Sequence, residues 1–226
     1  MASARDVGKA IATIPGKAMP TAGHMLKRLV DAAVDGVDPL PGAKTSAGRY
    51  LERRGDVDLA IESVVNQHIA LASAQGFVTN LGGVLTSIVT TPANLTGVVV
   101  VQIRMVACIA HLRGYDIDDN RVRTAMLMCL LGEDDLADAI ASGALPTSPL
   151  AVATAPVFDA DLDRKVSERV VSALLANMSG KRLTSLVGRR IPLVGGGVGA
   201  AFDGYSTHRI GVCARHHLVN RRRLTR

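Results

Sequence analysis

The stretch GFVTNLGGVLTSIVTTPANLTGVVVVQIRMVACIAHLRGYD, residues 76–116, decides the fold. Residues 76–103 of this stretch belong to a longer run, residues 63–103, that contains no Asp, Glu, Lys or Arg. A membrane-spanning helix needs about 20 predominantly apolar residues. The best window, residues 92–112, contains Arg104 and three other polar residues, and an arginine near the bilayer centre costs roughly 2.5–3.5 kcal/mol. The stretch therefore predicts two buried helices that meet at Pro92.

The length of the uncharged run leaves a second interpretation open. In that interpretation, residues 77–112 form a hairpin that re-enters the membrane or lies in its surface. Phe77 and Tyr115 bracket the run, where interfacial aromatics occur. The segment GVVVVQI, residues 97–103, also fits a strand when taken alone. Because no strand pairs with hairpin turns are visible elsewhere, the sequence predicts an all-α fold.

Small side chains dominate the apolar composition. Hydrophobic residues make up 48% of the 226-residue chain, but aromatic residues only 3%, and Trp is absent. Such a composition favours a compact multi-helix bundle with glycine-rich, closely packed central helices. Cys108, Cys129 and Cys213 lie in apolar contexts and are predicted to be buried and reduced. Together with an N-terminus that does not resemble a signal peptide, they predict a cytoplasmic location.

The predicted organisation has two parts. Residues 1–48 are an extension rich in Gly, Pro and Ala with one short helix within 21–35, followed by a loop at 38–48. Residues 49–226 are the helical domain, which ends in a basic tail. Capping and breaking signals within it predict six further helices beside the pair that meets at Pro92. They begin near Asp56, Asp118–Asn120, Glu133, Asp161 or Asp163, and Pro192, and the stretch up to residue 188 forms a short basic helix of its own.

The glycine run IPLVGGGVGAAFDGYSTH, residues 191–208, matches the dinucleotide fingerprint at three positions. That fingerprint requires a βαβ unit and an acidic residue about 20 positions further on. Asp203 comes too early, so nucleotide binding is not predicted. As a helix, the run places small residues four apart, which allows another helix to approach closely. The predicted packing residues are Gly195, Gly196, Gly199, Ala200 and Gly204.

Two charged residues in apolar helices form a predicted buried pair. Arg104 shares a helix face with Cys108 and His111, and Asp203 lies on the glycine-lined face. Because an isolated buried charge is costly, we expect Arg104 to pair with Asp203. The alternative, in which both side chains point to water at opposite helix ends, stays open.

No metal site and no cofactor are predicted. His68, His111 and His208 each lie on or beside an apolar face, and three histidines can bind zinc. However, no H-E-x-x-H motif is present, and no two of these three lie on one predicted helix. The adjacent His216 and His217 are a poor chelating pair. If the protein is an enzyme, the catalytic candidates are Arg104, His111, Asp203 and His208.

The C-terminal end is strongly basic. Ten of the 26 basic residues, but only one of the 20 acidic residues, follow Gly180. This asymmetry predicts an anionic partner. No aromatic residue follows Tyr205, so stacking on nucleic-acid bases is disfavoured and a membrane surface is preferred. The candidate surface-binding residues are Arg215, Arg221, Arg222 and Arg223.

Four segments resemble, in order, the blocks of the EcsC protein family: GFVTNLGGVLTSIVTTPANL, VQIRMVACIAHLRGYD, MCLLG and IPLVGGGVGAAFDGYSTHRIGVCA. The resemblance covers roughly residues 50–217 and is weakest over 136–186. Members often carry a second proline near the position of Ile88. The resemblance implies a largely α-helical bacterial protein, cytoplasmic or peripherally attached to the inner face of the membrane. It implies no particular reaction.

The predicted function is peripheral binding of anionic membrane lipid or an apolar ligand. Two alternatives remain open. One is a hydrolase-type enzyme that acts on an apolar substrate in a helical pocket. The other is an accessory partner of a membrane transporter, for which the basic tail and the glycine-lined face are equally suitable.

Overall fold

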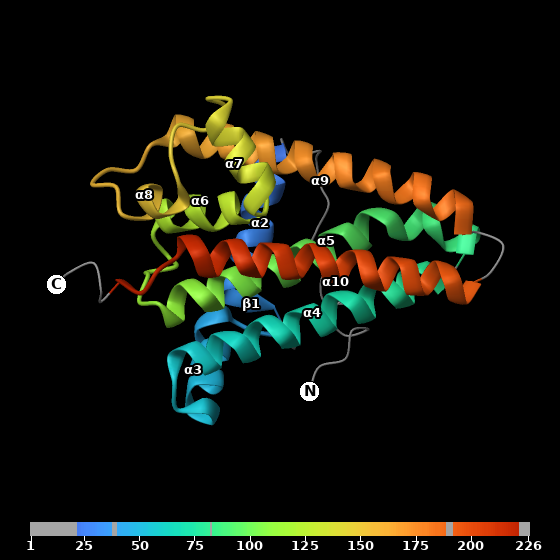
Figure 1. The fold of residues 1–226 in the computed structure, drawn as a ribbon, viewed down its shortest axis with the longest axis horizontal. Helices are drawn as coiled ribbons and strands as arrows, with labels where there is room; N and C mark the ends of the chain where they lie inside the picture. The colour runs from blue at the N-terminus through green and yellow to red at the C-terminus, as the bar shows by residue number, and fades with distance from the viewer. Residues whose placement is uncertain (1–21, 38–39, 82, 189–191, 222–226) are drawn as a thin grey trace.

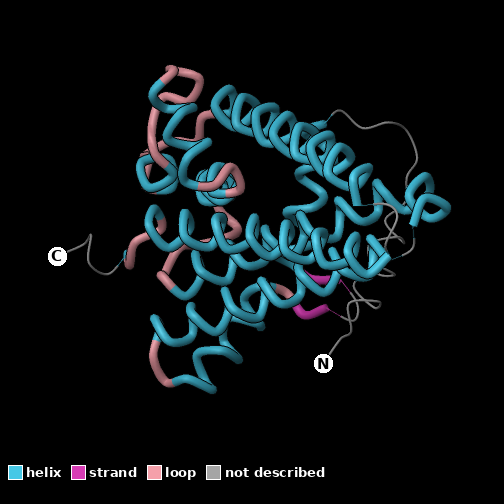
Figure 2. Tube along the Cα trace, turned by 45° about the vertical axis from the view of Figure 1, so that its right-hand side comes forward, coloured by secondary structure: helices cyan, strands magenta, loops and turns pink. Residues whose placement is uncertain are grey.

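The computed structural model describes residues 22–37, 40–81, 83–188 and 192–221, and they form an all-α bundle, as predicted (Figure 1). Two long helix pairs lie across the molecule, and shorter helices gather at one end. The helices within these ranges are α2 (Ala22–Asp35), α3 (Ala43–Arg54), α4 (Val57–Leu81), α5 (Gly83–Leu112), α6 (Asn120–Cys129), α7 (Glu133–Ala141), α8 (Pro149–Ala153), α9 (Ala160–Gly188) and α10 (Pro192–His217). The described strands, β1 (Gly36–Val37) and β2 (Leu40–Pro41), form one short antiparallel pair (Figure 2).

Helix α5 is the centre of the bundle, which explains the uncharged run. It packs against α2, α3, α4, α6 and α10. A helix that is enclosed on all sides is apolar around its whole circumference. The side chains of residues 98–103 and 105–110 are accordingly buried, and Gln102 is the polar residue among them. None of the helices, over the described ranges, is both long enough and apolar enough to cross a bilayer.

Helix α10 makes its most extensive contacts with α4, not with α5 as the sequence suggested. Glycines bring the two backbones together. A Cβ atom on Gly76 would lie 2.6 Å from the carbonyl oxygen of Gly199, and one on Gly204 would lie 2.3 Å from Ser73 Oγ. The small residues of α10 therefore leave space along one face of the helix, and α4 packs into that space.

Helix α2 belongs to the same core as the rest of the molecule. Leu26, Leu29 and Ala33 are buried in the main hydrophobic cluster, where α2 packs against α5 and α9. The boundary that the sequence placed after residue 48 thus separates α2 from helices that it contacts directly.

Several helix ends differ from the predictions. Residues 43–48, expected to be loop, begin α3; α4 continues past Gly76 to Leu81; and α5 runs through Pro92. Pro92 lies inside α5, which begins at Gly83, although a proline in a helix interior costs about 3 kcal/mol. Helix α9 is a single helix where two were expected.

The N-terminal caps explain where three helices start. Asp56 Oδ1 accepts from Leu59 N at 2.9 Å at the start of α4, and Asp119 Oδ1 accepts from Arg121 N at 2.9 Å at the start of α6. Asp159, rather than Asp161 or Asp163, caps α9 by accepting from Leu162 N at 3.0 Å. Carboxylates at these ends satisfy backbone N–H groups that have no partner within the helix.

Candidate functional site

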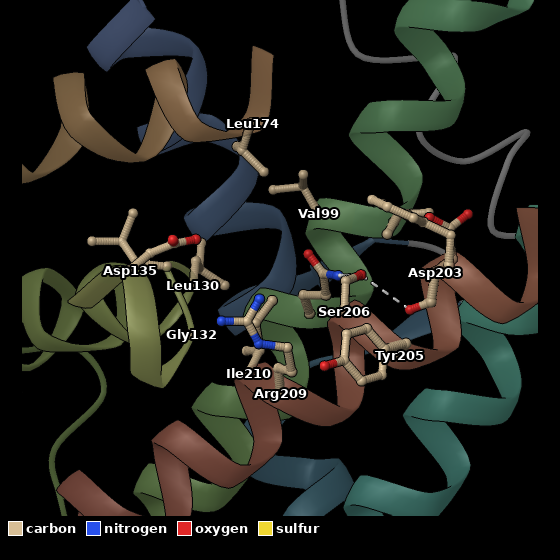
Figure 3. A pocket seen from close by; sticks show the side chains of 14 residues that line it. Val99, Leu130, Gly132, Asp135, Leu174, Asp203, Tyr205, Ser206, Arg209 and Ile210 are labelled. Atoms are coloured by element: carbon tan, nitrogen blue, oxygen red, sulfur yellow. Dashed lines mark hydrogen bonds between the residues drawn. The ribbon is translucent and has the colours of Figure 1, made fainter. Parts of the chain in front are cut away.

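A cavity of about 210 Å³ lies on the side of α10 that faces away from the α4 contact. Residues of α5, α7, α9, α10 and the turn between α6 and α7 line it. Figure 3 shows Leu174 and Val99 opposite Tyr205, Arg209 and Ile210 of α10. The lining residues are Val98, Val99, Gln102, Leu130, Leu131, Gly132, Asp135, Leu174, Phe202, Asp203, Tyr205, Ser206, Arg209 and Ile210.

The polar side of the cavity is a small hydrogen-bond network between α5 and α10. The Gln102 amide donates from Nε2 to Ser206 Oγ at 3.1 Å and to Thr207 Oγ1 at 3.2 Å. The two hydroxyls in turn donate to the carbonyl oxygen of Asp203, at 3.2 Å and 2.7 Å. Both Gln102 and Thr207 are buried, so the network satisfies polar groups that water does not reach.

Two features lie where the cavity meets solvent. Phe202 and Tyr205 remain 38% and 66% exposed although they are large aromatic side chains. Arg209 donates from Nη2 to Asp134 Oδ2 at 2.7 Å, which holds the guanidinium above the first turn of α7. The cavity thus combines apolar side chains with polar ones, including the carboxylates of Asp135 and Asp203, beside aromatic side chains and the paired Arg209 guanidinium.

Asp203 is the only one of the four catalytic candidates that lines this cavity. It is 4% exposed, and its Oδ2 atom would lie 2.5 Å from a Cβ atom on Gly76. The carboxylate therefore occupies space that the absence of a side chain at Gly76 leaves free on α4.

Arg104 points away from α10, so the structure does not bring it to Asp203. Its Nη2 donates to Ser46 Oγ of α3 at 2.5 Å. Residues two apart on a helix point about 200° away from each other. Because Gln102 faces α10, Arg104 must face the opposite side of α5, towards α3, where burial lowers its pKa. Gln102 is the polar partner of α10 that the sequence analysis missed.

The other two catalytic candidates lie elsewhere. His111 is half-buried near the end of α5; burial first, and then Lys44, lower its pKa. His208 is exposed on α10. Arg104, His111 and His208 are not among the residues that line the cavity with Asp203. The catalytic set proposed from the sequence is therefore not assembled here.

The predicted surface-binding and packing residues are described only in part. Arg215 is half-buried and Arg221 is exposed, and Arg221 N donates to Arg113 O at 3.0 Å, which fixes Arg221 against the turn after α5. Arg222 and Arg223 lie outside the described residues. Of the packing set, Gly199 and Gly204 contact α4 and Ala200 is half-buried, whereas the surroundings of Gly195 and Gly196 lie outside the described residues.

A second group of reactive side chains lies where α7 begins and α10 ends. One ligand atom each of Glu133, Cys213 and His217 falls within 4.8 Å of the other two. Cys213 and His217 are four residues apart and share a face of α10. That spacing is the signal that the sequence analysis overlooked, because it treated Cys213 as a buried apolar residue and His217 only as a neighbour of His216. All three cysteines are unpaired and buried, as predicted.

Comparison with known families gives one assignment: the model of the EcsC protein family matches residues 4–224. The match begins well before residue 50, where the visible resemblance started, and so includes α2. Comparisons with curated proteins and with solved structures found no match.

Proposed function

The chain belongs to the EcsC protein family, and from the cavity beside α10 we propose that it is a peripheral, lipid-associated binding protein of the inner membrane face. In this proposal, one acyl chain enters the cavity while basic residues near the C-terminus contact anionic headgroups. The observation that carries the proposal is a cavity that is lined in part by apolar side chains and also by the exposed aromatic residues Phe202 and Tyr205.

The size of the cavity limits its ligand. At about 210 Å³ it is smaller than the 300–1,000 Å³ of sites for drug-sized molecules, and larger than the 150 Å³ apolar cavity that holds benzene. This volume suits a segment of a single hydrocarbon chain and is too small for a nucleotide or a complete phospholipid. The hydrocarbon chain of the ligand would lie against Val98, Val99 and Ile210, with the ligand's polar end near Ser206 and Arg209.

The edge of the cavity supports contact with a membrane surface. Aromatic side chains such as those of Phe202 and Tyr205 are favoured at the level of lipid headgroups. A basic residue near an anionic surface contributes about 1 kcal/mol to binding. Arg215 and Arg221 lie at the end of the same helix and just beyond it, and Arg222 and Arg223 follow in the sequence.

Flotation with phosphatidylcholine vesicles, with and without an anionic phospholipid, tests the electrostatic part of the proposal. We expect binding to the anionic vesicles to be much stronger. Replacing Arg215 and Arg221 by Gln should weaken it about thirtyfold, from about 1 kcal/mol per residue. The control replaces Arg164 and Arg169 by Gln, which removes the same charge from exposed positions of α9. Equal binding to both kinds of vesicle contradicts the proposal.

A fluorescent fatty acid tests the cavity itself. Leu174 lines the cavity from α9, so Leu174→Phe should fill part of it and weaken fatty-acid binding at least about tenfold, since a methylene-sized change already alters a packed site. Leu162→Phe, at a half-buried position of the same helix outside the cavity, is the matched control and should bind normally. If both variants bind as the unchanged protein does, the ligand does not occupy this cavity.

A further inference from the structure

The group of side chains between α7 and α10 contains three kinds of metal-binding atom. Glu133 offers a carboxylate oxygen, Cys213 a sulfur and His217 an imidazole nitrogen, and these atoms lie within 4.8 Å of one another. Zn²⁺ bonds of about 2.0–2.3 Å in a tetrahedron put ligand atoms about 3.3–3.8 Å apart. The three atoms therefore need to move together by roughly 1 Å, which side-chain rotation provides.

One atom of the group lacks a hydrogen-bond partner. Glu133 Oε2 is buried without one, whereas Oε1 accepts from His216 Nδ1 at 2.8 Å and lies 3.4 Å from His217 Nε2. A buried carboxylate oxygen without a partner carries a substantial desolvation cost. A bound cation would provide the missing interaction, which the neighbouring imidazoles do not supply to Oε2.

The backbone holds the three residues in place from two rigid elements. Cys213 and His217 occupy one face of α10, one turn apart. Gly132, with φ of +77°, turns the chain from α6 into α7, so that Glu133 is the first residue of α7. Ligands carried on helices keep their spacing better than ligands carried on loops.

We propose that Glu133, Cys213 and His217 form a Zn²⁺ site that joins the first turn of α7 to the last turn of α10. A sulfur, a nitrogen and an oxygen ligand together suit Zn²⁺, whereas Mg²⁺ and Ca²⁺ prefer oxygen alone. The thiol proton leaves as the Zn–S bond forms, so one thiolate and one carboxylate balance the charge of the ion. The Glu133 and His217 side chains are 37% and 18% exposed, which leaves a solvent-facing fourth position for water.

Two neighbours surround the site without belonging to it. The thiol of Cys129 lies near that of Cys213, but Cys129 is not among the residues whose ligand atoms all lie within 4.8 Å. His216 is 68% exposed and hydrogen-bonds Glu133 Oε1. A residue that orients a ligand in this way typically changes metal affinity 10–100-fold when it is replaced.

Cobalt and zinc titrations test the site. Protein without a histidine tag is stripped with a chelator under reducing conditions and titrated with Co²⁺. We expect one tetrahedral Co²⁺ ion per chain, with a thiolate-to-cobalt charge-transfer band that Zn²⁺ abolishes. Cys213→Ser should remove the band. Glu133→Gln and His217→Gln should each weaken Zn²⁺ binding at least about tenfold, the lower limit even for residues that only orient a ligand.

Cys129→Ser is the matched control. It replaces a thiol that is equally buried and lies beside Cys213, so it should keep the charge-transfer band and the Zn²⁺ affinity. Absence of the band in the unchanged protein overturns the proposal even if a variant fails to fold. A Zn²⁺ affinity of Cys213→Ser equal to that of the unchanged protein also overturns it, as does equal loss of binding in Cys129→Ser and Cys213→Ser.

Discussion

The two sides of α10 are packed in opposite ways. Towards α4, glycines let the backbones meet, and the Gly76 position has room for the Asp203 carboxylate but not for a methyl group. Towards α5 and α9, larger side chains such as Phe202 and Ile210 leave a cavity of about 210 Å³ between the helices. Small residues close an interface because the helix axes can approach, whereas larger residues keep the axes apart and leave gaps wherever their shapes do not match.

The largest effect is expected from breaking the closed side. In Gly76→Ala, the new Cβ atom meets a backbone oxygen of Gly199 at 2.6 Å, and a backbone shifts less easily than a side chain. We expect a loss of about 3 kcal/mol in the free energy of unfolding, the upper part of the range for overpacking. Denaturant unfolding measures it.

Gly197→Ala provides the control for this loss. It lies on α10 with nothing within 4 Å of the added atom, so the same substitution should stabilise the protein by up to about 1 kcal/mol through helix propensity. Equal destabilisation by the two substitutions would show that the close contact of α4 and α10 does not limit stability.

The next effect is a pH dependence caused by the tight packing around α4. His68 donates from Nδ1 to Val64 O at 2.7 Å, its Nε2 atom is buried without a partner, and burial lowers its pKa from 6.5 to about 4. The unfolded chain therefore binds a proton that the folded protein rejects between pH 6.5 and 4. The contribution of His68 to the free energy of unfolding is complete above pH 6.5. It decreases as the pH is lowered further, by about 2 kcal/mol at pH 5.

Unfolding free energies at pH 8 and pH 5 measure this dependence. His68→Leu should remove about 2 kcal/mol of the difference between the two pH values. His208→Leu, at an exposed position of α10, should leave the difference unchanged. An unchanged pH dependence in His68→Leu would mean that other groups cause it.

The smallest effect is expected on the open side. Gln102→Met keeps the length of the side chain but removes its hydrogen bonds to Ser206 and Thr207, at a cost of about 1 kcal/mol. Gln67→Met is the same change at an exposed position of α4, where Tyr50 Oη donates to Gln67 Oε1 at 2.6 Å, and should cost less than about 0.5 kcal/mol. Similar losses for both would mean that burial gives the Gln102 network no additional strength.

The sequence predicted the fold class, the family and the use of glycine in α10 because these depend on local patterns. The uncharged run, the cap at Asp56 and the small residues from Gly199 to Gly204 each carry their signal within a few turns of chain. The partner of the glycine face was predicted incorrectly. Gly76 was predicted to end a helix, whereas its missing side chain allows α10 to pack closely against α4. That contact depends on a helix more than a hundred positions away in the chain.

The site was harder to predict for the same reason. Arg104 attracted attention as a charge in an apolar helix, but its direction depends on how α5 is rotated between α3 and α10. The sequence gives the period of a helix and does not give its rotation relative to helices that join later. Gln102 and Arg104 are two positions apart and face opposite sides of α5. If α5 is assigned the wrong rotation, Arg104 is placed at the cavity and Gln102 against α3, which is the reverse of what the structure shows.

The pairing of α4 with α10 also affects how the chain folds as it is made. Helix α4 is complete at Leu81, but α10 does not begin until Pro192. At synthesis rates of 5–20 residues per second, roughly 5–20 s separate the two. Throughout that time the face of α4 that contains Gly76 has been synthesised, but α10, which covers it, has not. During synthesis this face of the core therefore stays partly uncovered until α10 has emerged from the ribosome.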